Sequence, residues 1–224
     1  MFKTWAECLP QNTEVCAVEL PGHDRLFKEQ PFIRLPPLIE AIADSIDQSL
    51  ELPYVLFGHS MGALLAFELT RELRRRGAPE PAKLFVSAHR APHLPDPRPK
   101  VAELSDADFI DELHRLQGTP PQTLENSDLM VLLLPLLRAD FALCESYEYT
   151  QEVPLECPIV AFGGLDDNEL KYQEVLSWGE HTTGKFHIYM MQGNHFFIHT
   201  AKKLILEVVS DELTMLKEAN VGRA

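Results

Sequence analysis

One stretch decides the fold, and it runs Tyr54-Val-Leu-Phe-Gly-His-Ser-Met-Gly-Ala-Leu-Leu-Ala-Phe67. Its first four residues are apolar throughout, which predicts a short strand that is buried on both faces. From Met61 onward the residues are apolar almost all round, so we expect a helix with a buried beginning. The charged segment 71–76 and the following Gly77 predict a solvated helix end. The sequence therefore places a sharp turn between a buried strand and a buried helix.

The turn itself, Gly58-His-Ser-Met-Gly62, matches the pattern G-x-S-x-G. At a junction of strand and helix, this pattern is typical of a serine whose hydroxyl is exposed on a strained turn, and the two glycines permit close approach of neighbouring elements. The beginning of the helix offers unpaired N–H groups, and the N–H of Met61 can donate to an oxyanion. We predict that Ser60 is a nucleophile; the alternative is a glycine-rich turn with a passive serine.

Outward from this turn, short apolar runs alternate with helical patterns. The expected strands are 14–20, 54–57, 83–88, 158–162 and 185–191, and the expected helices are 37–50, 61–76, 169–178 and 197–218. Such alternation is typical of an α/β fold with a parallel sheet and helices on both faces.

The alternation stops in the middle of the chain. A proline-rich stretch, 92–99, leads into about fifty residues with no strand pattern. A capping box predicts a helix over 105–116, and residues 127–149 suggest two more helices hinged near Pro135. We therefore predict a single domain over residues 1–224, with a helical insertion at about 95–152.

A serine hydroxyl needs a base to take its proton and a third group to orient that base. For a serine on this kind of turn, the expected order along the chain is Ser, then Asp or Glu, then His. The loop after strand 158–162 supplies Asp166 and Asp167, and the loop after strand 185–191 supplies His195. We predict His195 as the base. Asp167 is favoured over Asp166 as the orienting acid, because a turn normally uses its first acid to bond its own backbone.

The composition excludes several classes of protein. Among 224 residues, 20 are basic and 34 acidic, which gives a net charge of −14 and argues against a nucleic-acid binder. A hydrophobic content of 45% and a charged content of 24% are typical of a globular domain. The longest apolar run, Leu129 to Leu137, is well below the roughly 20 residues that cross a bilayer, and no apolar signal core follows Met1. We therefore expect a cytoplasmic protein with no membrane or nucleic-acid partner.

The cysteines and histidines predict neither a disulfide framework nor a metal site. Unrelated spacings indicate free thiols at Cys8, Cys16, Cys144 and Cys157. The pairs His195/His199 and His89/His93 are each four residues apart, but neither includes the glutamate of an H-E-x-x-H motif. His59, next to the serine, is expected to pack or hydrogen-bond under the turn.

Taken together, the motifs resemble those of type II thioesterases of polyketide and nonribosomal peptide synthesis, within the α/β-hydrolase superfamily. The similarity runs over nearly the whole chain and includes Leu20-Pro-Gly22, Leu56-Phe-Gly-His-Ser-Met-Gly-Ala63, Leu84-Phe-Val-Ser87, Arg90-Ala-Pro92, Leu137-Arg-Ala-Asp140 and His195-Phe-Phe197. G-x-S-x-G alone indicates only the superfamily. The motifs Leu137-Arg-Ala-Asp140 and His195-Phe-Phe197 are typical of a much smaller group of proteins within it.

The resemblance implies an enzyme that hydrolyses acyl groups from the phosphopantetheine arm of carrier proteins and so clears stalled synthases. It implies an α/β-hydrolase fold in which the insertion at about 95–152 is a lid that shapes the acyl channel. The roles that carry over are Ser60 as nucleophile, His195 as base, Asp167 as orienting acid and the Met61 N–H as oxyanion donor. The implied partner is an acyl or peptidyl carrier protein, and no cofactor is implied because the substrate carries the phosphopantetheine. We expect a monomer, although the sequence does not determine the oligomeric state.

The chain departs from the family pattern at two points. Asn194 stands where the family usually has a second glycine before the histidine, which the turn tolerates if it accepts Asn at a positive φ. Relatives also begin with an inner strand and a glycine-rich loop, about 25 residues before the tryptophan that matches Trp5, and this loop supplies the second oxyanion donor. Without that strand, two strand edges are exposed, and the missing donor costs about 10²–10³ in rate.

This second departure leaves several interpretations open. Either the true start lies before Met1, or the protein is a weakened enzyme or a non-catalytic homologue that binds carrier proteins or acyl groups. A carboxylesterase for small esters would share every catalytic residue and differ only in substrate.

Overall fold

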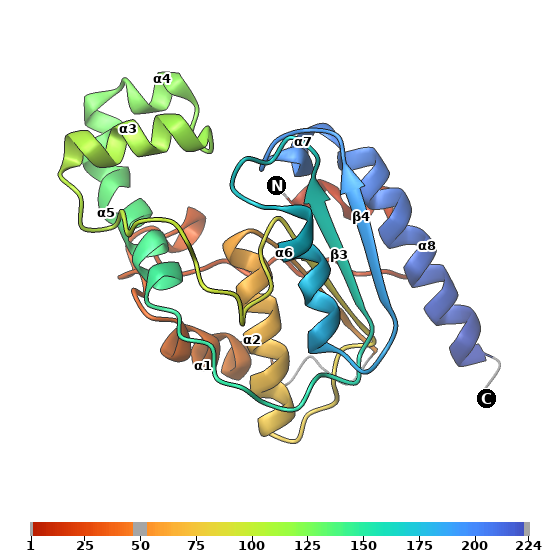
Figure 1. Ribbon diagram of the computed structural model, residues 1–224. Coiled ribbons are helices and arrows are strands. Elements are labelled where there is room, and N and C mark those ends of the chain that lie inside the picture. The colour runs from red at the N-terminus through yellow and green to blue at the C-terminus, as the bar shows by residue number, and fades with distance from the viewer. Residues whose placement is uncertain (1, 47–52, 222–224) are drawn as a thin grey trace.

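The computed structural model describes residues 2–46 and 53–221. In these residues the centre of the molecule is a four-stranded parallel sheet in the order β1-β2-β3-β4 (Figure 1). The strands are β1 (Val55–His59), β2 (Lys83–Ser87), β3 (Ile159–Gly164) and β4 (Phe186–Met191). Because all strands are parallel, their carboxyl ends, and the loops that follow them, lie at the same edge of the sheet.

Helices flank the sheet where the sequence predicts them, but their boundaries differ from the predicted ones. They are α1 (Leu35–Ile46), α2 (Met61–Arg75), α6 (Tyr172–Leu176), α7 (Phe197–Thr200) and α8 (Lys202–Val221), with 3₁₀ turns at Phe2–Thr4, Ala6–Cys8, Asp24–Leu26 and Ser177–His181. The helix expected at 37–50 begins earlier, and its predicted residues 47–50 lie outside the described residues. The helix expected at 197–218 is divided into α7 and α8 at Ala201.

The sheet separates two hydrophobic clusters, because successive side chains of a strand point to opposite faces. Leu84 and Val86 of β2 pack in one cluster with Phe67 of α2. Phe85 of β2 packs in the other cluster with Ile205 of α8. Helices therefore cover both faces of the sheet, as the uninterrupted apolar strands predict. The predicted α/β fold with a parallel sheet is confirmed.

The prediction of a strand at 14–20 is wrong. Among the residues that the structure describes, this segment has no strand partner and forms no ladder. Val15 packs against the α8-side cluster, while Val18 is 53% exposed. An alternating pattern alone does not make a strand, because the backbone needs a neighbour to bond with. Among the described residues, β1 lies at an edge of the sheet. Trp5 packs edge-on against Phe57 of β1, at 4.8 Å between ring centroids, in the cluster on the α8 face.

Residues 88–158, all of which the structure describes, contain helices and no strand apart from an isolated bridge at Leu155. The helices are α3 (Asp106–Leu116), α4 (Pro121–Leu124) and α5 (Ser127–Glu145), and they project away from the sheet (Figure 1). Ser105 caps α3, as predicted, by accepting a hydrogen bond from the Asp108 N–H at 3.2 Å. The division into one domain with an inserted segment stays a prediction; below, "helical insertion" means α3, α4 and α5.

The two helices expected around Pro135 are a single helix, α5, with the proline inside it. A proline in a helix interior removes a backbone hydrogen bond. Packing on both sides of it compensates: Met130 is buried in a cluster of the insertion itself, and Leu143 is buried against α1 and α2. None of the helices described by the structure combines the length and the apolar character needed to span a membrane.

Candidate active site

Ser60 occupies the sharp turn between β1 and α2, with a backbone of φ 54° and ψ −123°. This is a strained conformation for a residue with a side chain. The Ser60 N–H donates to the carbonyl oxygen of Ser87 at the end of β2, at 2.7 Å, which ties the turn to the neighbouring strand. A Cβ at Gly58 would lie 1.9 Å from the Gly62 carbonyl oxygen, so this position needs glycine.

The second glycine of the motif does not have the predicted role in close packing. A Cβ at Gly62 would meet no heavy atom of the described chain within 4 Å. The turn therefore depends sterically on Gly58. Met61 is the first residue of α2, and its N–H is one of those at a helix beginning that have no acceptor within the helix.

His195 lies in the loop after β4 and faces the serine. Its Nε2 is 2.9 Å from Ser60 Oγ, and its Nδ1 is 2.9 Å from Asp167 Oδ2. The ring is 18% exposed, whereas the Asp167 side chain is completely buried. Asn194 is not among the residues with positive φ; Gly193 carries the turn instead, with φ 119°. The turn therefore does not require a positive φ at Asn194, and asparagine fits there without that condition.

The two neighbouring aspartates differ in what they contact. Asp167 Oδ1 accepts the Glu169 N–H at 2.8 Å, while its Oδ2 faces His195. Asp166 Oδ2 accepts the Gly193 N–H at 3.3 Å and so joins the two loops. The preference for Asp167 agrees with this geometry, but its reason does not. The bond to the local backbone is made by Asp167 itself, whereas Asp166 bonds the histidine loop.

His59 lies under the turn, as expected. Its Nδ1 is 2.9 Å from Ser87 Oγ, and its Nε2 is buried without a hydrogen-bond partner among the described residues. Burial, followed by the charges of His195 and His199, lowers the pKa of His59 to about 3. This ring is therefore neutral near pH 7.

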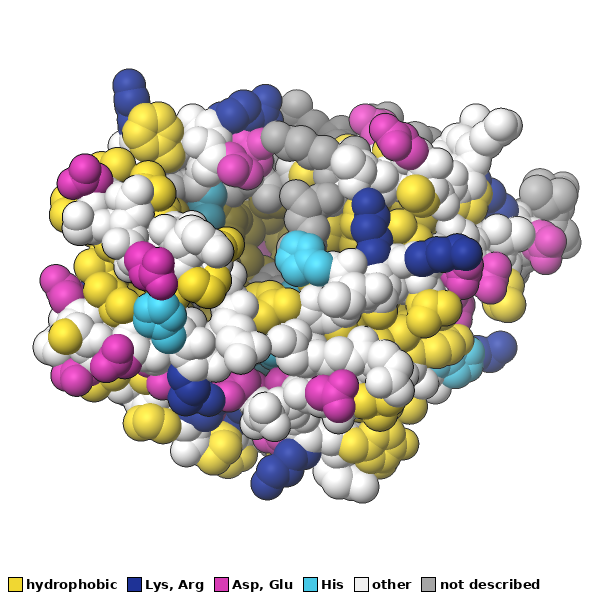
Figure 2. Space-filling model, turned by 90° about the horizontal axis from the view of Figure 1, so that it is seen from above, with side chains coloured by type: hydrophobic (Ala, Val, Ile, Leu, Met, Phe, Trp, Pro, Cys, Tyr) yellow, Lys and Arg dark blue, Asp and Glu magenta, His cyan; other side chains and the backbone are white. Residues whose placement is uncertain are grey.

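A cavity of about 140 Å³ adjoins Asp167 and His195 on the side of the helical insertion. It is lined by the end of α3, the aspartate loop and the histidine loop, namely Arg115, Leu116, Gln117, Asp166, Asp167, Asn168, Glu169, Asn194 and His195. Figure 2 looks down on this end of the molecule, where the surface is hollowed beside a histidine side chain. Among the described residues, no group of three or more His, Cys, Asp or Glu side chains is placed to hold a metal ion.

Sequence reasoning missed two residues that support this site. Ser87 bonds both the turn of Ser60 and the ring of His59, and Glu169 bonds Asp167. Ser87 could have been found, because it ends the strand next to the serine strand and parallel strands end at one edge. The bond from Glu169 depends on how the loop turns after β3, and the sequence carries no comparable signal for it.

A serine between a strand and a helix of a parallel sheet, with an aspartate and a histidine after later strands, defines an α/β hydrolase. The chain matches the family model for the thioesterase domain over residues 1–213. The chain belongs to this thioesterase family, and the resemblance noted in the sequence is thereby confirmed.

Individual relatives agree with this family. The gramicidin S biosynthesis protein GrsT of Aneurinibacillus migulanus is 40% identical over 215 residues, covering 96% of this chain and 84% of GrsT. Among solved structures, RedJ, a thioesterase from the prodiginine pathway of Streptomyces coelicolor, is 39% identical with a TM-score of 0.87, covering 94% of this chain and 80% of RedJ. ClbQ, from the colibactin NRPS/PKS pathway, is 26% identical with a TM-score of 0.92, covering 97% and 92%.

Proposed function

We propose that this protein is a serine thioesterase that hydrolyses acyl or peptidyl groups from the phosphopantetheine arm of carrier proteins. The observation that carries the proposal is the hydrogen-bonded series from Ser60 Oγ through His195 to the buried Asp167. This geometry suits the activation of a hydroxyl that is otherwise a weak nucleophile.

In the proposed reaction, Ser60 Oγ attacks the thioester carbonyl carbon while His195 Nε2 takes the hydroxyl proton. Asp167 stabilises the imidazolium, and the Met61 N–H donates to the oxyanion of the tetrahedral intermediate. When the intermediate collapses, the C–S bond breaks and the leaving thiol receives the proton from His195. Water then attacks the acyl-enzyme with His195 again as base, which releases the carboxylic acid and restores Ser60. The scheme needs no cofactor, because the phosphopantetheine belongs to the substrate.

The relatives support the choice of substrate class. GrsT is named for gramicidin S biosynthesis, RedJ for the prodiginine pathway and ClbQ for an NRPS/PKS pathway. In such pathways, intermediates are carried as thioesters on carrier proteins. We assign this protein the editing role of removing stalled acyl groups in polyketide, nonribosomal peptide or fatty acid synthesis.

The test is hydrolysis of acyl-loaded carrier protein by the wild-type protein and by Ser60→Ala. Removal of the nucleophile is expected to lower kcat by about 10⁴-fold or more, since only oxyanion and binding contributions remain. Ser45→Ala, an exposed serine on α1, serves as the matched control with unchanged activity. Circular dichroism of both variants checks that the fold is retained.

Labelling with a fluorophosphonate separates the proposal from its competitors. An activated serine should be labelled in the wild type and not in Ser60→Ala. Absence of labelling in the wild type would instead indicate a homologue that binds carrier proteins without catalysis. Faster turnover of small oxyesters than of acyl-carrier thioesters would indicate a carboxylesterase.

A further inference from the structure

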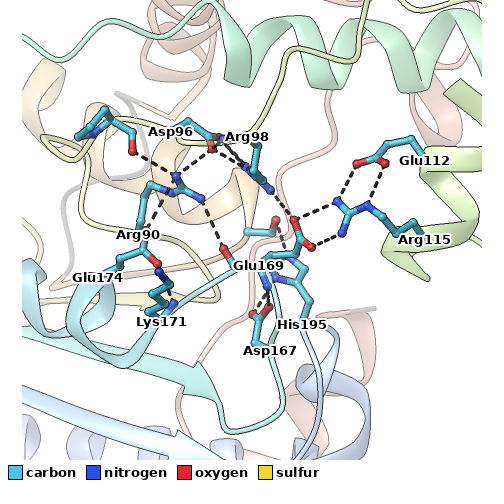
Figure 3. Close-up of polar contacts among 12 residues, drawn as sticks. Arg90, Asp96, Arg98, Glu112, Arg115, Asp167, Glu169, Lys171, Glu174 and His195 are labelled. Atoms are coloured by element: carbon cyan, nitrogen blue, oxygen red, sulfur yellow. Dashed lines mark hydrogen bonds and ion pairs between the residues drawn. The ribbon is translucent and has the colours of Figure 1, made fainter. Parts of the chain in front are cut away.

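Glu169 joins the proposed catalytic acid to the helical insertion (Figure 3). It lies two residues after Asp167, and its backbone N–H donates to Asp167 Oδ1 at 2.8 Å. The other oxygen, Oδ2, is 2.9 Å from His195 Nδ1. The orientation of the Asp167 carboxylate toward His195 therefore depends on where the backbone of Glu169 is held.

The side chain of Glu169 is held by arginines from two other segments. Arg115 of α3 contacts both carboxylate oxygens, with Nη1 2.6 Å from Oε1 and Nη2 3.3 Å from Oε2. Arg98, in the segment before α3, reaches Oε2 at 3.5 Å, and Arg90 donates to the Glu169 carbonyl oxygen at 3.4 Å. The Glu169 carboxylate is only 11% exposed, and the hydrogen bond from Arg115 is the largest of the causes that lower its pKa.

The end of α3 rests on the histidine loop as well. Gln117 Oε1 accepts a hydrogen bond from Asn194 Nδ2 at 3.3 Å. A Cβ at Gly118 would lie 2.6 Å from Cζ of Phe196, so the chain after α3 packs closely on the residue next to His195. Arg115 is thus part of a contact between one end of α3 and both loops of the proposed triad.

We propose that Glu169 is a positioning residue, which Arg115 clamps so that the Glu169 N–H holds Asp167 in line with His195. Alignment of the triad then depends on α3 being docked, and the proposal rests on the thioesterase function argued above. Arg115 is 50% exposed, and an ion pair at such a place adds little to stability. A displacement of about 1 Å in a catalytic group, however, can cost about 100-fold in rate. Loss of the clamp should therefore reduce catalysis more than stability.

The experiment compares Glu169→Gln, Arg115→Gln and the double variant, with kcat and KM measured on an acyl-N-acetylcysteamine thioester. Each single variant is expected to lower kcat about tenfold with KM nearly unchanged. The double variant should lose no more than either single one, because both residues act through one contact. Arg115→Lys, which keeps the charge, should recover part of the lost rate.

Arg76→Gln is the matched control. Arg76, the residue that directly follows α2, also contacts one carboxylate on the adjoining helix, Glu72 of α2, and one on another helix, Asp44 of α1. It lies at the opposite end of α2 from Ser60, so the same loss of ion pairs should leave kcat unchanged while shifting the melting temperature by a similar amount.

Three outcomes would overturn the proposal: an unchanged kcat in both single variants, a rise in KM without a fall in kcat, or losses that multiply in the double variant. The proposed function fails separately. If the wild-type protein neither hydrolyses the thioester nor is labelled by a fluorophosphonate at Ser60, the thioesterase assignment is wrong whatever the clamp variants do.

Discussion

The carboxyl end of the sheet and the helical insertion are built in different ways. At the sheet end, backbone hydrogen bonds join the loops directly: Ser60 N–H to the Ser87 carbonyl at 2.7 Å, and Asp166 N–H to the Gly193 carbonyl at 3.0 Å. The insertion packs around a cluster of its own, centred on the fully buried Phe109. It reaches the triad loops mainly through the side chain of Arg115 and the chain just after it.

This difference separates what is fixed from what can move. At the sheet end, backbone hydrogen bonds between neighbouring loops hold the groups of the proposed triad in place before substrate arrives, which is the arrangement that electrostatic catalysis needs. The insertion packs mainly around its own cluster and is joined to α1 and α2 by the buried Leu143 of α5, but it meets the loops of the proposed triad largely through polar side chains. Its α3 end can therefore shift without disturbing the sheet. The predictions below test each half of this comparison.

The largest effect is expected at the sheet end, from Asp167→Asn. The amide has one acceptor oxygen, so if that oxygen keeps the Glu169 N–H its NH₂ group faces His195 Nδ1 and favours the wrong tautomer. Because the neutral amide also stabilises the imidazolium less than a carboxylate does, kcat should fall by about 10⁴-fold. Asp166→Asn is the matched control, because it keeps an oxygen that can accept the Gly193 N–H, and it should cost less than about tenfold. Rates on an acyl thioester decide the question; equal losses in the two variants would contradict the assignment of Asp167.

A large loss of stability is expected from Gly58→Ala. The added Cβ would overlap the Gly62 carbonyl oxygen at 1.9 Å and push β1 away from α2, at an expected cost of about 4 kcal/mol or more in the free energy of unfolding. Gly62→Ala faces open space, and alanine favours a helix interior, so this variant should be neutral or slightly stabilising. Urea unfolding of both variants measures the difference, and similar midpoints would show that the turn relaxes around the methyl group.

The sequence predicts best what neighbouring residues decide. The strand before Ser60, the helix after it and the order of the acid and the base all follow from local patterns and from the parallel sheet. The segment 14–20 fails for the opposite reason, since its pattern is that of a strand while the backbone finds no partner. The predicted hinge at Pro135 is wrong because packing at both ends of α5 overrides the tendency of proline to break a helix.

The site shows the same division. The loops that carry Asp167 and His195 could be identified from their positions after strands, whereas the bond from Glu169 to Asp167 could not. It depends on a loop conformation and on arginines 54 and 71 residues away along the chain. The predicted roles of Asp166 and Gly62 are wrong because both depend on the surroundings in the folded chain. Asp166 bonds the backbone of Gly193 in another loop, and the space beside Gly62 is open.

A moderate effect that is confined to the insertion is expected from Phe109→Ala. This ring packs edge-on against Phe141 at 5.4 Å and lies under the guanidinium of Arg138. Truncation should destabilise the insertion by about 3 kcal/mol and speed amide exchange in α3, α4 and α5 while the strands stay protected. Phe162→Ala in β3 is the control and should speed exchange throughout. If both variants loosen the whole chain equally, the insertion is not a separate unit.

The smallest effect concerns a second attachment of the insertion, the contact between His23 Nε2 and Asp140 Oδ2 of α5 at 3.1 Å. The hydrogen bond with Asp140 is the main cause that raises the pKa of His23 above 6.5. A raised pKa in the folded state means that the stabilisation is complete below pH 6.5 and is lost as the pH rises through the folded value. The melting temperature of the wild type should therefore exceed that of His23→Gln most at about pH 5.5, by the equivalent of less than about 1 kcal/mol, and the difference should vanish by about pH 9. The difference in melting temperature between the wild type and Asp140→Asn should depend on pH in the same way. A difference that grows as the pH rises would contradict a stabilising contact between the protonated His23 and Asp140.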